Sequence, residues 1–166
     1  MNITATPRPV LAQTEYNSTL WIGHLQHNAN DRSAGQTFHC PLEGTIDNIQ
    51  VFSAAVTHPG EVELTLHEFD HASKSWGPAI GHSRRRMERD QTEQWVRFVL
   101  DPVPLQKDAS YGFQLHSRNA IIGIGEAVSN ARNPFPYGYS WNGHHRTEDE
   151  HFFRFFSMTF KLEMCA

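Results

Sequence analysis

The feature that most constrains the fold is a strict alternation of apolar and polar side chains in EVELTLHEF, residues 61–69. Val62, Leu64 and Leu66 occupy every second position, and polar residues stand between them. Successive side chains of an extended chain point to opposite faces, so this pattern places the apolar residues on one face of a β-strand. The same period of two recurs along the chain between turn signals, whereas a helical period is hard to find. The sequence therefore predicts an all-β protein.

Similar segments separated by turns predict about eight or nine short strands. Segment 79–89 is ambiguous, because its arginines suit a helix as well as a solvent-exposed strand. A chain of 166 residues is long enough for one domain with a proper core. We therefore expect an antiparallel β-sandwich of the jelly-roll type over residues 19–166, preceded by an N-terminal arm over residues 1–18. The expected strands cover residues 19–25, 36–40, 46–56, 61–69, 94–100, 110–117, 120–127 and 152–164.

The charge balance is mildly acidic, with 18 Asp and Glu against 14 Lys and Arg. Such a chain has no general electrostatic attraction to nucleic acid or to anionic lipid. Its densest positive run, Arg84-Arg85-Arg86, is neutralised within a few residues by Glu88 and Asp90. The N-terminal segment has no basic region followed by an apolar run, and no stretch approaches ~20 apolar residues. We therefore expect no signal peptide, no nucleic-acid partner and no membrane partner, while the compartment is left open.

One motif suggests a metalloprotease, because His67-Glu68-Phe69-Asp70-His71 matches H-E-x-x-H. In such enzymes the two histidines lie one helical turn apart, about 6 Å between their side-chain bases. Here the preceding residues alternate, so His67 is expected at the end of a strand. Extended chain would separate His67 and His71 by about 13 Å, which is too far for both to bind one zinc ion. We interpret the motif as a strand end that runs into a hairpin loop.

No other catalytic constellation can be read from the sequence. It contains neither His-x-His, which cupin metal sites require, nor Gly-x-Ser-x-Gly, and Cys40 and Cys165 define no disulfide framework. A metal site assembled from the distant His67, His82 or His116 stays open as an alternative. We therefore predict no catalytic residue, no metal ligand and no cofactor, with enzymatic activity left undecided.

The aromatic loop NPFPYGYSWNGHH, residues 133–145, is the most suggestive segment for ligand binding. Tyr137, Tyr139 and Trp141 alternate there with small polar residues, in a stretch too polar and proline-rich to be core. Exposed rings can stack on the apolar faces of pyranose sugars, but they can equally form a lid that closes the sandwich. Trp76, in the 70–79 loop, carries the same ambiguity. Both interpretations stay open at this point.

A resemblance to a known family rests on AGQTFHCPLEGTIDNIQVF, residues 34–52. This stretch resembles the opening of bacterial β-sandwich modules of carbohydrate-binding-like, jelly-roll character. The similarity extends over residues 34–163 through the spacing of turns and core positions. It implies a sandwich fold and a binding role, usually in exported proteins, and it implies no catalytic motif. The matching positions are Ala34, Phe38, Pro41, Gly44, Ile46, Ile49 and Val51.

These observations together predict a non-catalytic binding module whose ligand is a glycan. Three residues are expected to stack on sugar rings, namely Trp76, Tyr139 and Trp141. Three more are expected to hydrogen-bond to hydroxyl groups, namely Glu126, Arg132 and Asn142, and Tyr137 completes the candidate site. The first alternative is a structural or assembly module that forms a homo-oligomer or docks on a partner protein. The second is a cupin-like metal enzyme.

Overall fold

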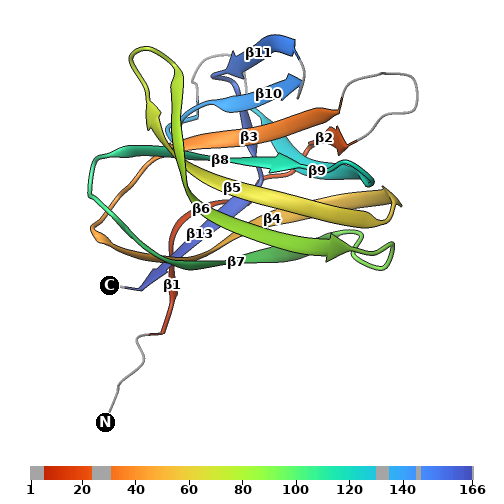
Figure 1. Cartoon of the computed structure of the whole chain (residues 1–166), viewed down its shortest axis with the longest axis horizontal. Helices are drawn as coiled ribbons and strands as arrows, with labels where there is room; N and C mark the ends of the chain where they lie inside the picture. The colour runs from red at the N-terminus through yellow and green to blue at the C-terminus, as the bar shows by residue number, and fades with distance from the viewer. Residues whose placement is uncertain (1–5, 24–30, 130–134, 145–146, 166) are drawn as a thin grey trace.

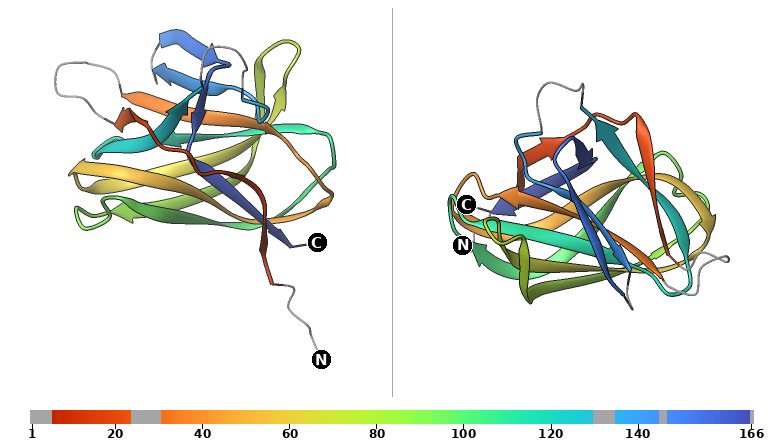
Figure 2. Two further views of the ribbon diagram at one scale, coloured as in Figure 1. Left: turned by 180° about the vertical axis from the view of Figure 1, so that it is seen from behind. Right: turned by 90° about the horizontal axis from the view of Figure 1, so that it is seen from above.

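The protein is built almost entirely from antiparallel β-strands, as a computed structural model shows (Figure 1). The structure describes residues 6–23, 31–129, 135–144 and 147–165. The strands form one sheet that curls into a half-barrel (Figures 1 and 2). Within these residues no helix is long and apolar enough to cross a membrane. The predicted all-β class is confirmed.

Thirteen strands are present in the described part of the chain, compared with the predicted eight or nine. The first seven are β1 (Arg8–Gln13), β2 (Ser18–Gly23), β3 (Arg32–His39), β4 (Gly44–His58), β5 (Gly60–Asp70), β6 (Ser75–Met87) and β7 (Gln94–Leu105). The remaining six are β8 (Ser110–His116), β9 (Ile121–Val128), β10 (Ser140–His144), β11 (Thr147–Phe153), β12 (Phe156–Met158) and β13 (Phe160–Cys165).

The strands follow one continuous order around the curled sheet. The main path runs β1-β13-β4-β9-β2-β3-β8-β5-β6. Strand β7 pairs with β4, β12 pairs with β9, and β10 lies between β3 and β11. Strands β13 and β8 are far apart in this order. The ring centroids of Phe160 of β13 and Phe113 of β8 nevertheless lie 5.7 Å apart, so the core fills the inside of the curled sheet.

The alternation in residues 61–69 has the predicted result. Val62, Leu64 and Leu66 are almost fully buried in the core, while Glu61 is exposed and Glu63 half-buried on the other side of β5. Burial of each leucine side chain contributes about 1.5–3 kcal/mol to folding. The ambiguous segment 79–89 belongs mostly to β6, where the exposed Arg84 and Arg86 stand opposite Glu63 and Glu61 of β5.

Three strands lie where no strand was predicted. Within the expected N-terminal arm, β1 pairs with β13, and the expected long loop 128–150 contains β10 and most of β11. The predicted strand 152–164 is divided among the end of β11, the short β12 and β13. The sequence pattern did not indicate these strands, because they are short or lack alternation. Backbone hydrogen bonds to neighbouring strands hold them in place.

The H-E-x-x-H motif lies on a strand and not on a helix. His67 belongs to β5, and His71 follows in the turn to β6. The ring nitrogens of His67 lie 3.0 Å from the Gly77 carbonyl oxygen and 2.8 Å from the Thr65 hydroxyl oxygen. Both nitrogens are thus engaged locally, and the predicted extended conformation is confirmed.

Candidate ligand-binding face

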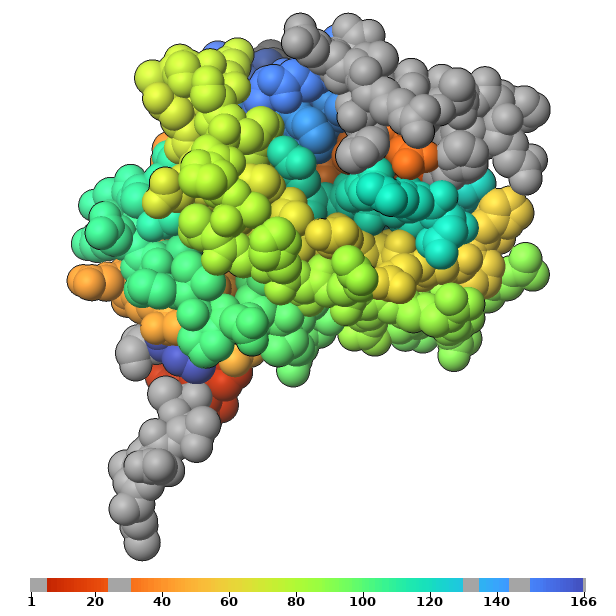
Figure 3. All heavy atoms as spheres, in the orientation of Figure 1, coloured from red at the N-terminus to blue at the C-terminus, as the bar shows by residue number. Residues whose placement is uncertain are grey.

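Strands β3, β8, β5 and β6 turn one set of alternate side chains into the core and the other set outward. Residues that stand opposite each other in antiparallel strands share a face. Glu63 of β5 is opposite His116 of β8 and also opposite Arg84 of β6. We call the resulting solvent-facing side of these strands, together with β10, the outer face. Figure 3 shows it with the β5–β6 hairpin in yellow-green beside β10 in blue, and the β8–β9 turn in teal.

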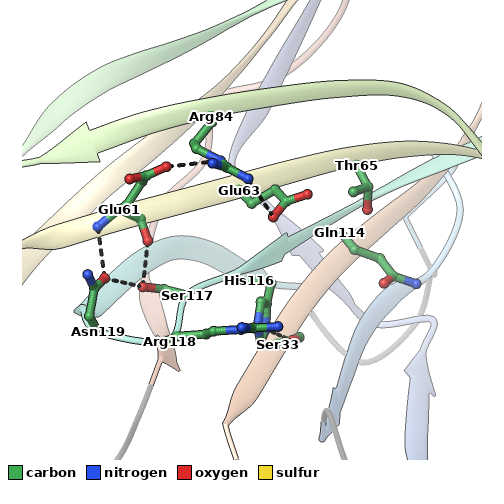
Figure 4. A pocket seen from close by; sticks show the side chains of 10 residues that line it. All are labelled: Ser33, Glu61, Glu63, Thr65, Arg84, Gln114, His116, Ser117, Arg118 and Asn119. Carbon is green, nitrogen blue, oxygen red and sulfur yellow. Dashed lines mark hydrogen bonds and ion pairs between the residues drawn. The ribbon is translucent and has the colours of Figure 1, made fainter.

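A hollow of about 530 Å³ lies on the outer face. We call it the polar groove, and Figure 4 shows its side chains. Arg84 Nε lies 2.9 Å from Glu61 Oε1, and Arg84 Nη2 lies 3.8 Å from Glu63 Oε2. The polar groove is lined by Ser33, Glu61, Glu63, Thr65, Arg84, Gln114, His116, Ser117, Arg118 and Asn119.

Further hydrogen bonds hold the polar side chains of the groove in place. The Ser117 hydroxyl donates to the Glu61 carbonyl oxygen at 2.7 Å, and the Glu61 backbone N–H donates to Asn119 Oδ1 at 3.0 Å. Ser33 Oγ and His116 Nδ1 lie 3.1 Å apart. The groove therefore presents oriented donors and acceptors before any ligand arrives.

Two tryptophan rings stand on the outer face next to the polar groove. A Cβ atom on Gly112 would lie 2.6 Å from the Trp76 ring, and one on Gly35 would lie 3.1 Å from the Trp141 ring. Each ring thus covers a glycine, where no side chain separates it from the strand. The two ring centroids are 5.4 Å apart with planes at 71°. Gln114 of the groove is two positions from Gly112 and stands opposite Gly35, so the two covered glycines lie next to the groove on neighbouring strands.

Tyr139 and Phe152 extend this pair of rings. The centroid of Phe152 lies 5.8 Å from that of Tyr139 and 6.5 Å from that of Trp76. We call Trp76, Tyr139, Trp141 and Phe152 the aromatic ridge. Gly138 precedes Tyr139 with a φ of 146°, a conformation that favours glycine. The Tyr139 backbone N–H donates to the Thr37 hydroxyl oxygen at 2.7 Å, and this hydrogen bond holds the loop on β3.

The two tryptophans of the ridge differ in exposure. Trp141 is only 7 % exposed, and its Nε1–H donates to Glu150 Oε2 at 2.9 Å. Trp76 is half-buried, so part of its ring is open to solvent. Trp76 therefore presents the more accessible ring of the two.

The predicted site residues fall into three groups. The three predicted stacking residues, Trp76, Tyr139 and Trp141, are brought together in the aromatic ridge. Tyr137 lies apart from them, with its ring centroid 6.1 Å from that of Phe160 at the edge of the core. Asn142 stands opposite the buried Ala34, so it points to the other face of β10.

The other two predicted hydrogen-bonding residues lie away from the outer face or outside the described part of the chain. Glu126 belongs to β9, which pairs with β2, β4 and β12. It is 7 % exposed, and it accepts a hydrogen bond from the Ser18 hydroxyl at 3.2 Å. Burial raises its pKa above the ordinary glutamate value, against the lowering effect of this hydrogen bond. Arg132 lies outside the described residues.

Sequence reasoning missed the polar groove. Gln114, His116 and Glu63 lie at the polar positions of strands that the alternation predicted. Their outward direction could have been read from that alternation. Their proximity could not, because it follows from the pairing of β5 with β8.

The three histidines considered for a metal site contact different residues. His67 is bonded to Gly77 and Thr65, His82 Nδ1 lies 3.8 Å from Glu63 Oε1, and His116 contacts Ser33. No group of three His, Cys, Asp or Glu side chains that could hold a metal ion occurs within the described ranges. The described residues thus offer no support for the cupin alternative.

Comparison with known proteins assigns no family to this chain. No protein-family model and no curated protein matches it. The resemblance to carbohydrate-binding-like modules therefore stays a prediction, and function has to be argued from the outer face.

Proposed function

We propose that this protein is a non-catalytic binding module that recognises a glycan on its outer face. The observation that carries the proposal is the proximity of the polar groove to the aromatic ridge, because Gln114 of the groove stands opposite Gly35, which the Trp141 ring covers. A pyranose ring combines an apolar C–H face with a rim of hydroxyl groups, so it needs both kinds of surface side by side. Ligand sites generally combine such apolar walls with a few placed polar groups.

The polar groove suits hydroxyl groups because it offers both donors and acceptors. Glu63 accepts, Arg84 donates, and the Gln114 amide does both. The positive charge of Arg84 is compensated, because Arg84 forms ion pairs with Glu61 and Glu63. A neutral hydroxyl can join such a network without leaving a buried charge unpaired.

The ridge supplies the apolar half of the proposed site. Aromatic rings bury much apolar area at low entropic cost, and they often dominate binding energy. Since Trp76 is the more exposed tryptophan of the ridge, we expect it to contact the sugar. Its truncation to alanine would then cost about 2 kcal/mol, or roughly 30-fold in affinity.

Isothermal titration calorimetry against a panel of neutral and acidic polysaccharides tests the proposal. Trp76→Ala and Gln114→Ala should both weaken binding, and circular dichroism should show that both variants keep the fold. Trp21→Ala is the matched control, because Trp21 is 37 % exposed on β2, outside the groove and the ridge. Absence of binding to every polysaccharide, or an equal loss in the control, would count against a glycan site here.

Assembly with a second copy is a second candidate, favoured by an exposed apolar patch. Tyr16, Val128 and Phe155 are each about 40 % exposed, at 43, 41 and 40 % respectively. Hydrogen bonds join their segments: the Val128 backbone N–H donates to Asn17 Oδ1, and the Ser129 backbone N–H donates to the Phe155 carbonyl oxygen. Light scattering measures the molecular mass of the protein and of the variant Phe155→Ser. An oligomer that assembles through this patch should dissociate in the variant, whereas a glycan-binding monomer should keep its mass.

We also propose that the curled sheet is a jelly-roll variant of the β-sandwich. One core enclosed by the curled sheet supports this assignment, as do exclusively antiparallel pairs among the described strands. An experimental structure in which the sheet closes into a continuous barrel would refute it.

A further inference from the structure

A second pocket lies on the far side of the aromatic ridge from the polar groove. His39 of β3 stands opposite Ser110 of β8, beyond Gly112 along that strand. His71 comes from the β5–β6 hairpin, and Arg154 from the bend between β11 and β12. These side chains and Tyr139 surround a space of about 180 Å³, which we call the histidine pocket.

The rings of the histidine pocket are held by mutual contacts. The centroids of His39 and His71 are 4.8 Å apart, and His71 is stacked on Tyr139 at 4.8 Å with planes at 15°. His39 Nδ1 lies 2.8 Å from the Ser110 hydroxyl oxygen. That bond leaves His39 Nε2 as the nitrogen available to a ligand. When the hydroxyl donates to Nδ1, the neutral ring carries its proton on Nε2.

The charge of the pocket is positive although the whole chain carries −4. Arg154 lines the pocket, and Lys74 Nζ lies 5.1 Å from the centroid of the Tyr139 ring. Among the described residues, no carboxylate forms an ion pair with Arg154 or Lys74. The nearby Asp70 accepts hydrogen bonds from two backbone N–H groups of its own hairpin, at 3.0 and 3.3 Å. Arg84 of the polar groove differs, because two glutamates compensate it.

We propose that the histidine pocket binds an oxyanion, that is, a carboxylate, sulfate or phosphate group. The planar guanidinium of Arg154 can donate two parallel hydrogen bonds to such a group. His39 and His71 add ring N–H donors, and a protonated ring adds charge. An anion would fill a small positive site whose cations have no carboxylate partner.

Binding should be coupled to the protonation of His71. Burial lowers its pKa first, and His39, Lys74 and Arg154 lower it further, while Asp70 acts in the opposite direction. Together with the Tyr139 phenol, which is stacked on the ring, these groups from β3, the hairpin and the β11–β12 bend are the charged or titratable ones that face His71. A bound anion favours the protonated ring, so its pKa rises and a proton is taken up. Affinity should then fall as pH rises, by at most about tenfold per pH unit for one proton.

This inference goes beyond the glycan proposal and does not require it. Ser110 and Gln114 lie four residues apart on β8, about 13 Å along the strand. One extended acidic saccharide could therefore reach both the polar groove and the histidine pocket. A free inorganic anion is the other source of the same chemistry.

The test is an NMR titration of the His39 and His71 ring signals with three probes: sodium sulfate, galacturonate and galactose. Galacturonate and galactose share a pyranose ring and differ in the carboxylate, so they isolate the charge. We expect sulfate, galacturonate or both to shift the two histidine signals and to raise the pKa of His71, and galactose to leave both unchanged. A response to sulfate alone identifies a free oxyanion as the ligand, and a response to galacturonate alone an acidic sugar.

Arg154→Gln should weaken the response about tenfold, because it removes a charge-assisted hydrogen bond. Arg89→Gln is the matched control, since Arg89 is an exposed arginine in the turn between β6 and β7, outside both the polar groove and the histidine pocket. No shift with either anion, an equal shift with galactose, or equal losses in the two variants would overturn the oxyanion site. None of these outcomes changes the loss of polysaccharide affinity expected for Trp76→Ala, so the glycan proposal is tested separately.

Discussion

Replacing Gly112 by alanine should destabilise the protein, although alanine normally suits a strand better than glycine. The added Cβ would lie 2.6 Å from Cζ3 and 2.9 Å from Cη2 of Trp76. Both distances are shorter than real Cβ contacts, so the indole ring must move off the strand. Overpacking costs about 1–3 kcal/mol, and the entropic gain over glycine returns about 0.5–1 kcal/mol. The expected net loss is about 1–2 kcal/mol.

Urea unfolding followed by tryptophan fluorescence measures this loss as a lower midpoint at unchanged slope. The same variant should bind glycan more weakly, because its ridge is displaced relative to the groove. Near-ultraviolet circular dichroism would report the altered environment of the ring while the far-ultraviolet spectrum stays that of a β-protein.

Gly81→Ala is the matched control for Gly112→Ala. Gly81 is also a buried strand glycine without a positive φ, but its added Cβ would meet Leu100 and Leu66 at 3.4 Å, near ordinary contact. The control should be neutral or stabilised by up to about 0.5–1 kcal/mol. Equal changes of one sign in both variants would refute the argument that the Trp76 ring requires a glycine beneath it.

Three further predictions concern the core and its buried titratable groups. Leu64→Ala should lower the free energy of unfolding by about 2–5 kcal/mol in a urea titration, because Leu64 is fully buried. Glu126→Gln should stabilise the protein at pH 7. Burial raises the pKa of Glu126 in the folded state, so the stability of the wild-type protein rises as pH falls through that pKa. The stability difference between wild type and variant should therefore vanish below the ordinary glutamate pKa. A difference that stays constant across pH would contradict this. Burial raises the pKa of the Cys40 thiol, so a thiol reagent at pH 8 should modify Cys165 well before Cys40. Equal modification rates of the two cysteines would contradict the described burial.

The candidate site was only partly predictable from sequence. The sequence grouped Trp76, Tyr139 and Trp141 in one candidate site, and their rings do lie close together on the outer face; their role in binding stays a prediction. The hydrogen-bonding partners could not be chosen in the same way. Asn142 follows Trp141 directly and therefore points to the opposite face of β10, and Glu126 lies on a strand of another part of the sheet. The partners that lie beside the ridge, such as Gln114, are supplied by strand pairing.

The sequence by itself determined the class of the fold and the direction of individual side chains. Alternation along one strand is a local property, and it decided that Val62, Leu64 and Leu66 face the core and that His67 and His71 are not one helical turn apart. Only the tertiary structure decided which strands are neighbours. Pairing joins residues distant in the chain, such as Thr65 with Gln114 and Gly35 with Trp141, and backbone hydrogen bonds that pair strands depend little on side-chain identity. The polar groove, the aromatic ridge and the histidine pocket all arise from that pairing.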